Sequence, residues 1–223
     1  MTLIEYTDLE QRSEEWFEAR CGVVTASVAG KLLTPTLRVA DNDVSRGLTA
    51  LLAAERITGF VEPSYLNDDM MRGVLHEPIA RERYAEHNGV AVDEVGFMVR
   101  EQDGWRLGYS PDGLVGGDGL IEVKCPRAKT HVRTIVDNEV PQHHLPQLQA
   151  GLFVSGRKWI DFVSFCAGLP MWTKRVEPDE QWFDAIAAAV SVVEEAIELM
   201  VADYRAASLG LPRTERIDLE VVI

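Results

Sequence analysis

Cysteine, long apolar runs and basic residues are all scarce in this sequence, and each shortage excludes a class of protein. The three cysteines, Cys21, Cys125 and Cys166, are odd in number and far apart. They exclude a disulfide framework and a paired-cysteine metal site, and they are typical of a reducing cytoplasm. No apolar run approaches the roughly 18–20 residues that a membrane-spanning helix needs. The acidic first residues predict no secretory signal.

Acidic residues outnumber basic ones, with 36 Asp and Glu against 22 Lys and Arg and a net charge of −14. Such a chain repels polyanions, nucleic acids included, unless its basic residues are concentrated locally. The 223 residues are 46% hydrophobic and 26% charged, which is the balance of a folded globular protein rather than a disordered one. The length fits one large domain or two small ones.

Hydrophobic periodicity and turn residues predict helices first, then strands, and a long helix near the end. One helix is expected to begin at Ser13. Further helices are expected over residues 45–59, 67–89, 140–154 and 179–204, with Pro78 as a kink or break in the second of these. The expected strands are 90–100, 105–109, 120–124, 159–165 and 171–176. Residues 211–223 fit either an edge strand or a docking tail.

This order of elements predicts a single α/β (α+β) domain over residues 1–223, with a mixed central β-sheet flanked by helices. Within it we expect a helical N-terminal part over about 1–89, a sheet-centred core over about 90–177, and a C-terminal helix and tail over 178–223.

Two acids and a lysine in the middle of the chain carry the chemical signal. Asp112 follows one predicted strand, and Glu122 and Lys124 are two apart in another, so these two side chains point to the same face. Carboxylates at one sheet edge form a hard-oxygen site for Mg²⁺, with a cation alongside, which phosphodiester hydrolysis requires. The alternative is a hairpin with a turn-capping Asp112 and a solvated Glu–Lys pair. The other residues of the Glu-x-Lys strand are apolar, which argues against a free surface.

These residues resemble the core of the PD-(D/E)xK nucleases, in the phage lambda exonuclease (YqaJ-type viral recombinase) branch. Ser-Pro-Asp112-Gly and Glu122-Val-Lys124-Cys-Pro carry that likeness. An earlier segment, Trp16-Phe-Glu-Ala-Arg20-Cys-Gly-Val-Val-Thr25-Ala-Ser27, is similar to the W-x-x-x-R-x-G-x-x-T-A-S of those exonucleases. Gly73-x-x-x-Glu77 and Gln147-Leu-Gln149 resemble two further motifs, in family order. The resemblance implies a restriction-endonuclease-like core.

The resemblance also implies roles at a metal centre. Asp112 and Glu122 would be Mg²⁺ ligands, together with the backbone carbonyl of Val123, and Mn²⁺ would substitute. Lys124 would be the catalytic lysine. Glu77 would approach the metals from its helix, through a second metal or a water; its alternative is one more surface carboxylate in a charged helix.

Two glutamines are candidates for positioning the nucleophilic water or the scissile strand, and the sequence does not choose between Gln147 and Gln149. The family pattern often continues to a tyrosine four residues after the glutamine. Here Gly151 or Phe153 stands at that place, so this part of the pattern is altered.

The earlier segment implies a pocket for a DNA 5′-phosphate formed by Arg20, Thr25 and Ser27. A guanidinium forks onto phosphate oxygens and hydroxyls donate to the rest. The alternative for Thr25 and Ser27 is a helix N-cap, and a helix N-terminus is itself an anion site. Trp16 fits the core better than a base-stacking platform.

The stretch 124–133 contains no acid, and we expect three of its cations to contact the DNA backbone: Arg127, Lys129 and Arg133. We therefore predict a basic channel for DNA on the surface of an otherwise acidic protein. Three other features favour plain structural roles. His143-His144 lacks a third ligand nearby, Gly113–Gly119 lacks the spacing of a phosphate loop, and Cys125 lacks a partnered histidine.

By resemblance, we expect a Mg²⁺-dependent 5′→3′ exodeoxyribonuclease acting on double-stranded DNA ends in the cytoplasm of a phage host. It would release 5′-mononucleotides and leave 3′ overhangs for a single-strand annealing partner, with a possible homotrimeric ring and no membrane association. The alternatives are an endonuclease of the same fold, a non-catalytic DNA-end-binding module, and a small-molecule phosphohydrolase.

Overall fold

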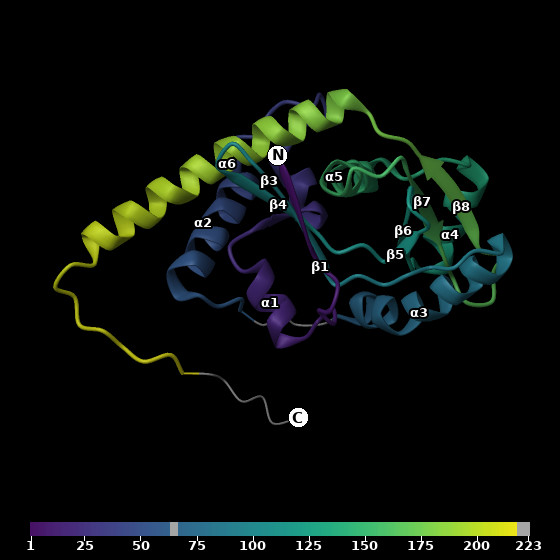
Figure 1. Ribbon diagram of the computed structural model, residues 1–223, viewed down its shortest axis with the longest axis horizontal. Helices are drawn as coiled ribbons and strands as arrows, with labels where there is room; N and C mark the ends of the chain where they lie inside the picture. The colour runs from purple at the N-terminus through teal and green to yellow at the C-terminus, as the bar shows by residue number, and fades with distance from the viewer. Residues whose placement is uncertain (63–66, 218–223) are drawn as a thin grey trace.

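The strands form two four-stranded sheets in the computed structural model, which describes residues 1–62 and 67–217 (Figure 1). The first sheet has the order β1 (Thr2–Tyr6), β3 (Phe97–Gln102), β4 (Trp105–Tyr109) and β2 (Val24–Thr25). The second has the order β5 (Gly113–Val115), β6 (Gly119–Lys124), β7 (Trp159–Ser164) and β8 (Trp172–Val176). Each sheet contains one parallel pair, β2 with β4 and β6 with β7. The predicted mixed α/β architecture is thus confirmed, with the strands divided between two sheets.

Strand β6 lies inside the second sheet because its residues are apolar on both faces. Leu120, Ile121 and Val123 are buried, as a strand covered on both sides requires. Its register pairs Glu122 with Phe162 of β7, while β5 pairs with it only as far as Ile121. The carboxyl end of β6 therefore extends beyond β5 and leaves room beside Val123.

Six α-helices pack around or between the sheets within the described residues: α1 (Glu14–Arg20), α2 (Asp43–Thr58), α3 (Asp68–Asn88), α4 (Ala128–Asp137), α5 (Leu145–Ser155) and α6 (Glu180–Ala207). Short 3₁₀ helices, η1 (Ala26–Leu32) and η2 (Gln142–His144), precede α2 and α5. Left-handed glycines end α2 and α3 at Gly59 and Gly89, as the sequence predicts. Pro78 lies inside an unbroken α3.

Several predicted boundaries are wrong. Residues 90–96 form no strand; within them only Asp93 makes a bridge, to Leu114. Helix α2 begins at Asp43 rather than at Ser45, because Asn42 is the N-cap and Ser45 completes a capping box with it. Val140 lies before η2, outside any helix. Strand β1 and helix α4 were not predicted at all.

Helix α5 lies at the centre of the molecule. Its Leu148, Ala150, Leu152 and Val154 are fully buried, and they belong to the largest hydrophobic cluster together with residues of both sheets and α6. The predicted apolar stripe of α6 buries Ile186, Ala189, Val193 and Ile197 in the same cluster. Because its apolar residues pack between the two sheets, the rotation of α5 about its axis is fixed, and so are the directions of its polar side chains.

The last two residues of the predicted α6 stripe, Met200 and Tyr204, are exposed. The C-terminal part of α6 extends past the body (Figure 1). Residues 211–217 form no strand, and the rest of the predicted tail lies outside the described residues.

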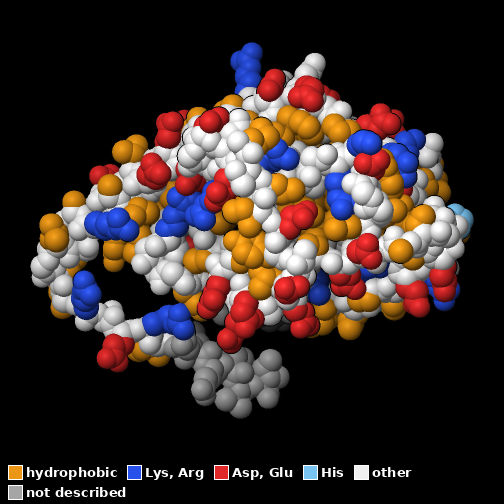
Figure 2. Space-filling view, in the orientation of Figure 1, with side chains coloured by type: hydrophobic (Ala, Val, Ile, Leu, Met, Phe, Trp, Pro, Cys, Tyr) orange, Lys and Arg blue, Asp and Glu red, His pale blue; other side chains and the backbone are white. Residues whose placement is uncertain are grey.

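No helix in the described ranges has both the length and the apolar character to cross a membrane. Figure 2 shows carboxylates spread over one face, with arginine and lysine in small groups.

Candidate active site

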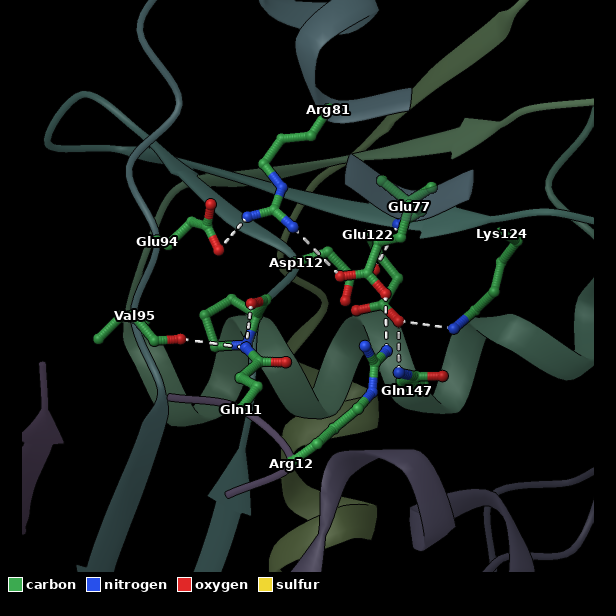
Figure 3. A network of polar contacts seen from close by, with 12 residues as sticks. Gln11, Arg12, Glu77, Arg81, Glu94, Val95, Asp112, Glu122, Lys124 and Gln147 are labelled. Carbon is green, nitrogen blue, oxygen red and sulfur yellow. Dashed lines mark hydrogen bonds and ion pairs between the residues drawn. The ribbon is translucent and has the colours of Figure 1, made fainter. Parts of the chain in front are cut away.

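The three side chains singled out by the sequence lie together where β4, β5 and β6 meet (Figure 3). Asp112 stands in the short connection between β4 and β5, and its Oδ2 accepts a hydrogen bond from the backbone N–H of Val123 at 2.6 Å. Lys124 Nζ donates to Glu122 Oε1 at 2.7 Å, which confirms that these two side chains share one face of β6. The turn and the strand thus bring two carboxylates and an ammonium into one cluster.

Glu122 is the most buried member of the cluster, at 1% exposure. Besides Lys124, its Oε1 accepts a hydrogen bond from the side-chain amide of Gln147 on α5. Its Oε2 accepts one from the hydroxyl of Tyr109 at 3.0 Å. A buried carboxylate needs such partners, because an unpaired buried charge is costly. Gln147 is therefore brought to the site.

Burial and neighbouring negative charges both act on the Asp112 carboxyl. Burial, followed by the negative charges of Glu122 and Glu77, raises the pKa of the Asp112 carboxyl well above its usual value. Burial alone would lower the pKa of the Lys124 ammonium, but Glu122 and Asp112 outweigh it and raise that pKa. The site therefore holds more negative charge than one lysine neutralises, which is the condition that a bound cation relieves.

The backbone of Val123 offers a further oxygen to the same space. The carbonyl of Lys124 accepts a hydrogen bond from Phe165 N on the β7 side, at 2.9 Å. Alternate residues of a strand direct their peptide groups to opposite edges, and the N–H and C=O of one residue share an edge. The Val123 carbonyl therefore points away from β7, toward Asp112.

Glu77 reaches the cluster from α3, and two arginines hold it. Arg12 Nη2 lies 3.2 Å from Glu77 Oε2, and Arg81 Nη2 lies 3.3 Å from Glu77 Oε1. Arg81 also pairs with Glu94 (Figure 3). Only 16% of the Glu77 side chain is exposed, so it is not a free surface carboxylate.

The oxygen atoms present suit a hard divalent cation. Asp112, Glu122 and the Val123 carbonyl are the oxygen types that Mg²⁺ prefers. Burial, together with the charges of Glu122 and Glu77, raises the pKa of Asp112, and a bound cation would offset both effects. No group of three or more His, Cys, Asp or Glu side chains is arranged as a metal site in residues 1–62 and 67–217. The donor set therefore depends on the backbone oxygen, and on water for its remaining positions.

A cavity of about 160 Å³ adjoins these acids and contains all three residues predicted to bind a 5′-phosphate. Its lining includes Arg20, Thr25 and Ser27, and also Asp112 and Gln147. In the described part of the chain the Thr25 side chain makes no capping hydrogen bond; its hydroxyl lies 3.1 Å from that of Ser27. The hydroxyls are therefore available to a ligand.

Arg20 faces this cavity, and no acid of the described residues forms an ion pair with it; Glu55 acts on it only at longer range. Its guanidinium lies 4.0 Å from the Trp16 ring centroid and donates to Ser110 Oγ at 3.1 Å, and within the described residues it forms no ion pair. Burial lowers the pKa of Arg20 to about 10, yet the side chain remains charged at neutral pH. A partly buried cation beside two hydroxyls is a site for an anion.

A match to a family model places this arrangement among known proteins. The model of the YqaJ-like viral recombinase domain matches residues 15–158, which include Arg20, Thr25 and Ser27 of the cavity and all three strands of the site. The chain belongs to this family. The likeness predicted from the motifs is thereby confirmed, and the site described above is that of a YqaJ-like domain.

Solved structures agree with the YqaJ-like assignment. The alkaline exonuclease LHK-Exo from Laribacter hongkongensis has a TM-score of 0.80 and 35% identity, over 90% of this chain and 100% of that one. Its complex with dAMP gives the same values. A phage-related exonuclease from Haemophilus somnus 129PT, at a TM-score of 0.58 and 14% identity over 82% of this chain and 96% of that one, shares the fold. None of the curated proteins matches the chain.

One predicted site residue of this YqaJ-like domain is misplaced. Gln149 does not reach the site: its amide donates to the Glu177 carbonyl at 2.9 Å and accepts from Asp179 N at 3.1 Å. Residues two apart on a helix point about 200° apart, so only one of the two glutamines faces Glu122. The prediction for Gln149 is wrong, and Gln147 takes the position.

The three cations predicted to contact DNA lie at and beyond the end of β6. Arg127 precedes α4 and pairs with Asp69 at 2.8 Å, and Arg133 pairs with Asp137 at 3.3 Å. Lys129 is exposed on the first turn of α4. All three are accessible, and contact with the DNA backbone stays a prediction for each.

Three further residues at the site were not predicted. Ser110 bonds both Trp16 Nε1, at 2.9 Å, and Arg20, and it lines the cavity. Its place in the Ser-Pro-Asp-Gly motif was a signal for it. Arg12 gave no such signal, because it reaches the YqaJ-like site from a segment that the sequence does not connect to β6. Tyr109 ends the predicted strand that leads to Asp112, and nothing in the sequence shows that its hydroxyl reaches Glu122.

Proposed function

We propose that this protein is a Mg²⁺-dependent 5′→3′ exodeoxyribonuclease that acts on double-stranded DNA ends, with Mn²⁺ as a substitute metal. The observation that carries the proposal is one cavity lined at once by Arg20, Thr25 and Ser27 and by Asp112. A phosphate held by the first three would lie next to the acids that surround the reacting bond. The name of the Laribacter relative, an alkaline exonuclease, supports the same activity.

The side chains divide the reaction between them. Asp112, Glu122 and the Val123 carbonyl would hold the metal, with Glu77 joining through a second metal or a water. When bound, the metal would polarise the phosphoryl group and lower the pKa of a water. The Lys124 ammonium, kept protonated by Glu122 and Asp112, stabilises the charge that develops on the phosphoryl oxygens. Gln147 orients the water or the scissile strand beside Glu122.

The size of the cavity supports release of mononucleotides. A volume of about 160 Å³ admits a terminal phosphate rather than a duplex, so an end seated there presents its first linkage to the acids. A crystal structure of the Laribacter enzyme with dAMP, a deoxynucleoside monophosphate, supports this product class. The product duplex would carry a 3′ overhang, the substrate of a single-strand annealing partner. The family resemblance further implies a homotrimeric ring and action in the host cytoplasm.

The experiment incubates the protein and Mg²⁺ with three DNAs: a linear duplex with 5′-phosphates, the same duplex with 5′-hydroxyls, and a covalently closed circle. We expect mononucleotides from the phosphorylated duplex, much slower loss of the hydroxyl form, and no cleavage with EDTA. Cutting of the circle would instead identify an endonuclease of the same fold. Binding of ends without any cleavage would identify a non-catalytic end-binding module.

Replacing Arg20 with glutamine should remove the preference for 5′-phosphorylated ends. A hydrogen bond to a charged group contributes about 1.5–3 kcal/mol, so we expect the ratio of kcat/KM for phosphate and hydroxyl ends to fall about 10- to 100-fold. Arg46, whose ion pairs with Asp41 and Asp43 are exposed, provides the matched control Arg46→Gln. An unchanged ratio in Arg20→Gln would place phosphate recognition elsewhere.

A further inference from the structure

Tyr109, the last residue of β4, directs a hydroxyl group at the innermost acid of the site. Both partners are nearly inaccessible, with 1% exposure for Tyr109 and 1% for Glu122. The Tyr109 hydroxyl donates to Glu122 Oε2 at 3.0 Å. The strands belong to different sheets, so this bond ties the first sheet to the second at the site itself.

The two oxygens of Glu122 have different partners. Oε1 accepts from Lys124 and from Gln147, two side chains with proposed tasks in the reaction. Oε2 accepts from Tyr109. A carboxylate oxygen has two lone pairs, so the Tyr109 bond uses one and leaves the other. It also fixes the rotation of the carboxylate about its terminal bond.

The phenol remains a neutral donor. Burial, followed by the charges of Glu122 and Asp112, raises the pKa of Tyr109 well above its usual value. Its hydroxyl therefore adds no charge to the site, in contrast to Lys124, and leaves the negative charge of Glu122 available to a cation.

Helix α5 has a glycine, Gly151, at the point where the Tyr109 ring packs against it. A Cβ at Gly151 would lie 2.8 Å from Tyr109 Cζ, closer than real Cβ atoms approach, because the ring lies directly on the helix backbone. Gly151 is buried and follows Gln147 by four residues, so it lies one turn further along the same side of α5. Packing against α5 therefore determines where the hydroxyl of Tyr109 is held.

We propose that Tyr109, seated on Gly151, is a positioning residue that orients the Glu122 carboxylate for a divalent cation. The proposal rests on the metal site proposed above. Hydrogen bonds to metal-ligating groups typically change metal affinity about 10- to 100-fold. Tyr109→Phe keeps the ring and removes the hydroxyl, so we expect it to weaken Mn²⁺ binding to the DNA-free chain by about that factor.

Tyr84 provides a matched control. Its buried hydroxyl donates to a carboxylate oxygen of Asp161 at 2.7 Å. Tyr84 belongs to the hydrophobic cluster between α3 and the second sheet, and neither residue lines the site cavity. Tyr84→Phe removes the same group from the same kind of bond. We expect it to lower thermal stability while the Mn²⁺ dissociation constant stays at the wild-type value.

The measurement is Mn²⁺ titration of the full chain, followed by electron paramagnetic resonance of the free ion, with thermal melts of each metal-free variant. Gly151→Ala, which displaces the Tyr109 ring, should weaken Mn²⁺ binding in the same direction. Equal Mn²⁺ affinity in wild type and Tyr109→Phe would overturn the positioning role and leave the nuclease proposal intact. A wild-type chain that binds no Mn²⁺ would overturn the metal assignment, and the role of Tyr109 with it.

Discussion

Lys124→Ala should cleave phosphorylated DNA ends at least about 100-fold more slowly than wild type, the usual loss when a charge partner of the transition state is removed. Lys124 Nζ lies 2.7 Å from Glu122 Oε1 and 28% of the Lys124 side chain is exposed, so the residue lies beside the acids and remains accessible from solvent. Because this charge acts on the developing transition state, the loss should appear in kcat rather than in KM. Single-turnover cleavage of a labelled 5′-phosphorylated duplex measures it.

The control for this variant is Lys174→Ala, which removes an equal charge from an exposed position on β8. It should cleave at the wild-type rate, because long-range charge effects are screened at physiological salt. Filter binding of the same duplex should show end binding retained in Lys124→Ala. Undiminished cleavage by Lys124→Ala would place the active site elsewhere on the chain.

Glu194→Ala should lower the free energy of unfolding by about 3–5 kcal/mol, since removing one partner of a buried pair leaves an uncompensated charge. Both oxygens of Glu194 on α6 accept from Arg56 on α2, at 2.7 and 2.8 Å. The side chains are only 10% and 19% exposed, respectively. Urea denaturation followed by circular dichroism measures the change.

The neighbouring Glu195→Ala makes the same substitution at an exposed position of α6, and it should change stability by less than about 0.5 kcal/mol. A destabilisation of similar size in both variants would contradict the importance of the Arg56 pair. Arg56 also donates from Nε to the Gly22 carbonyl at 2.8 Å, just before β2 and Thr25. We therefore expect Glu194→Ala to weaken 5′-phosphate selectivity as well.

The sequence was sufficient to predict that Asp112, Glu122 and Lys124 lie together, because their placement depends on local rules. Alternation along a strand placed Glu122 and Lys124 on one face, and the turn residues around Asp112 placed it at a strand end. Left-handed glycines likewise ended α2 and α3 where expected. In each case the deciding interaction joins residues close together in the chain.

The errors concern interactions between distant segments. Strand β1 forms only because it pairs with β3, more than 90 residues later, and Thr2 opposite Glu101 shows no pattern of its own. Helix α4 was interpreted only as a basic stretch. The residues that it buries, His131 and Thr134, are polar, so its buried face shows no apolar periodicity in the sequence. Gln149 was grouped with Gln147 because the rotation of α5 depends on which sheet each of its faces contacts.

Helix α5 also acts as a mechanical link. On one side its Gln147 donates to Glu122, a proposed metal ligand, and on the other its Gln149 bonds the backbone just before α6, at Glu177 and Asp179. One continuous helix thus joins the proposed reaction centre to the N-terminal end of α6, the helix whose C-terminal part extends past the body as an arm (Figure 1). A force applied to that arm by a neighbouring molecule or by moving DNA would therefore change the relative positions of the acids.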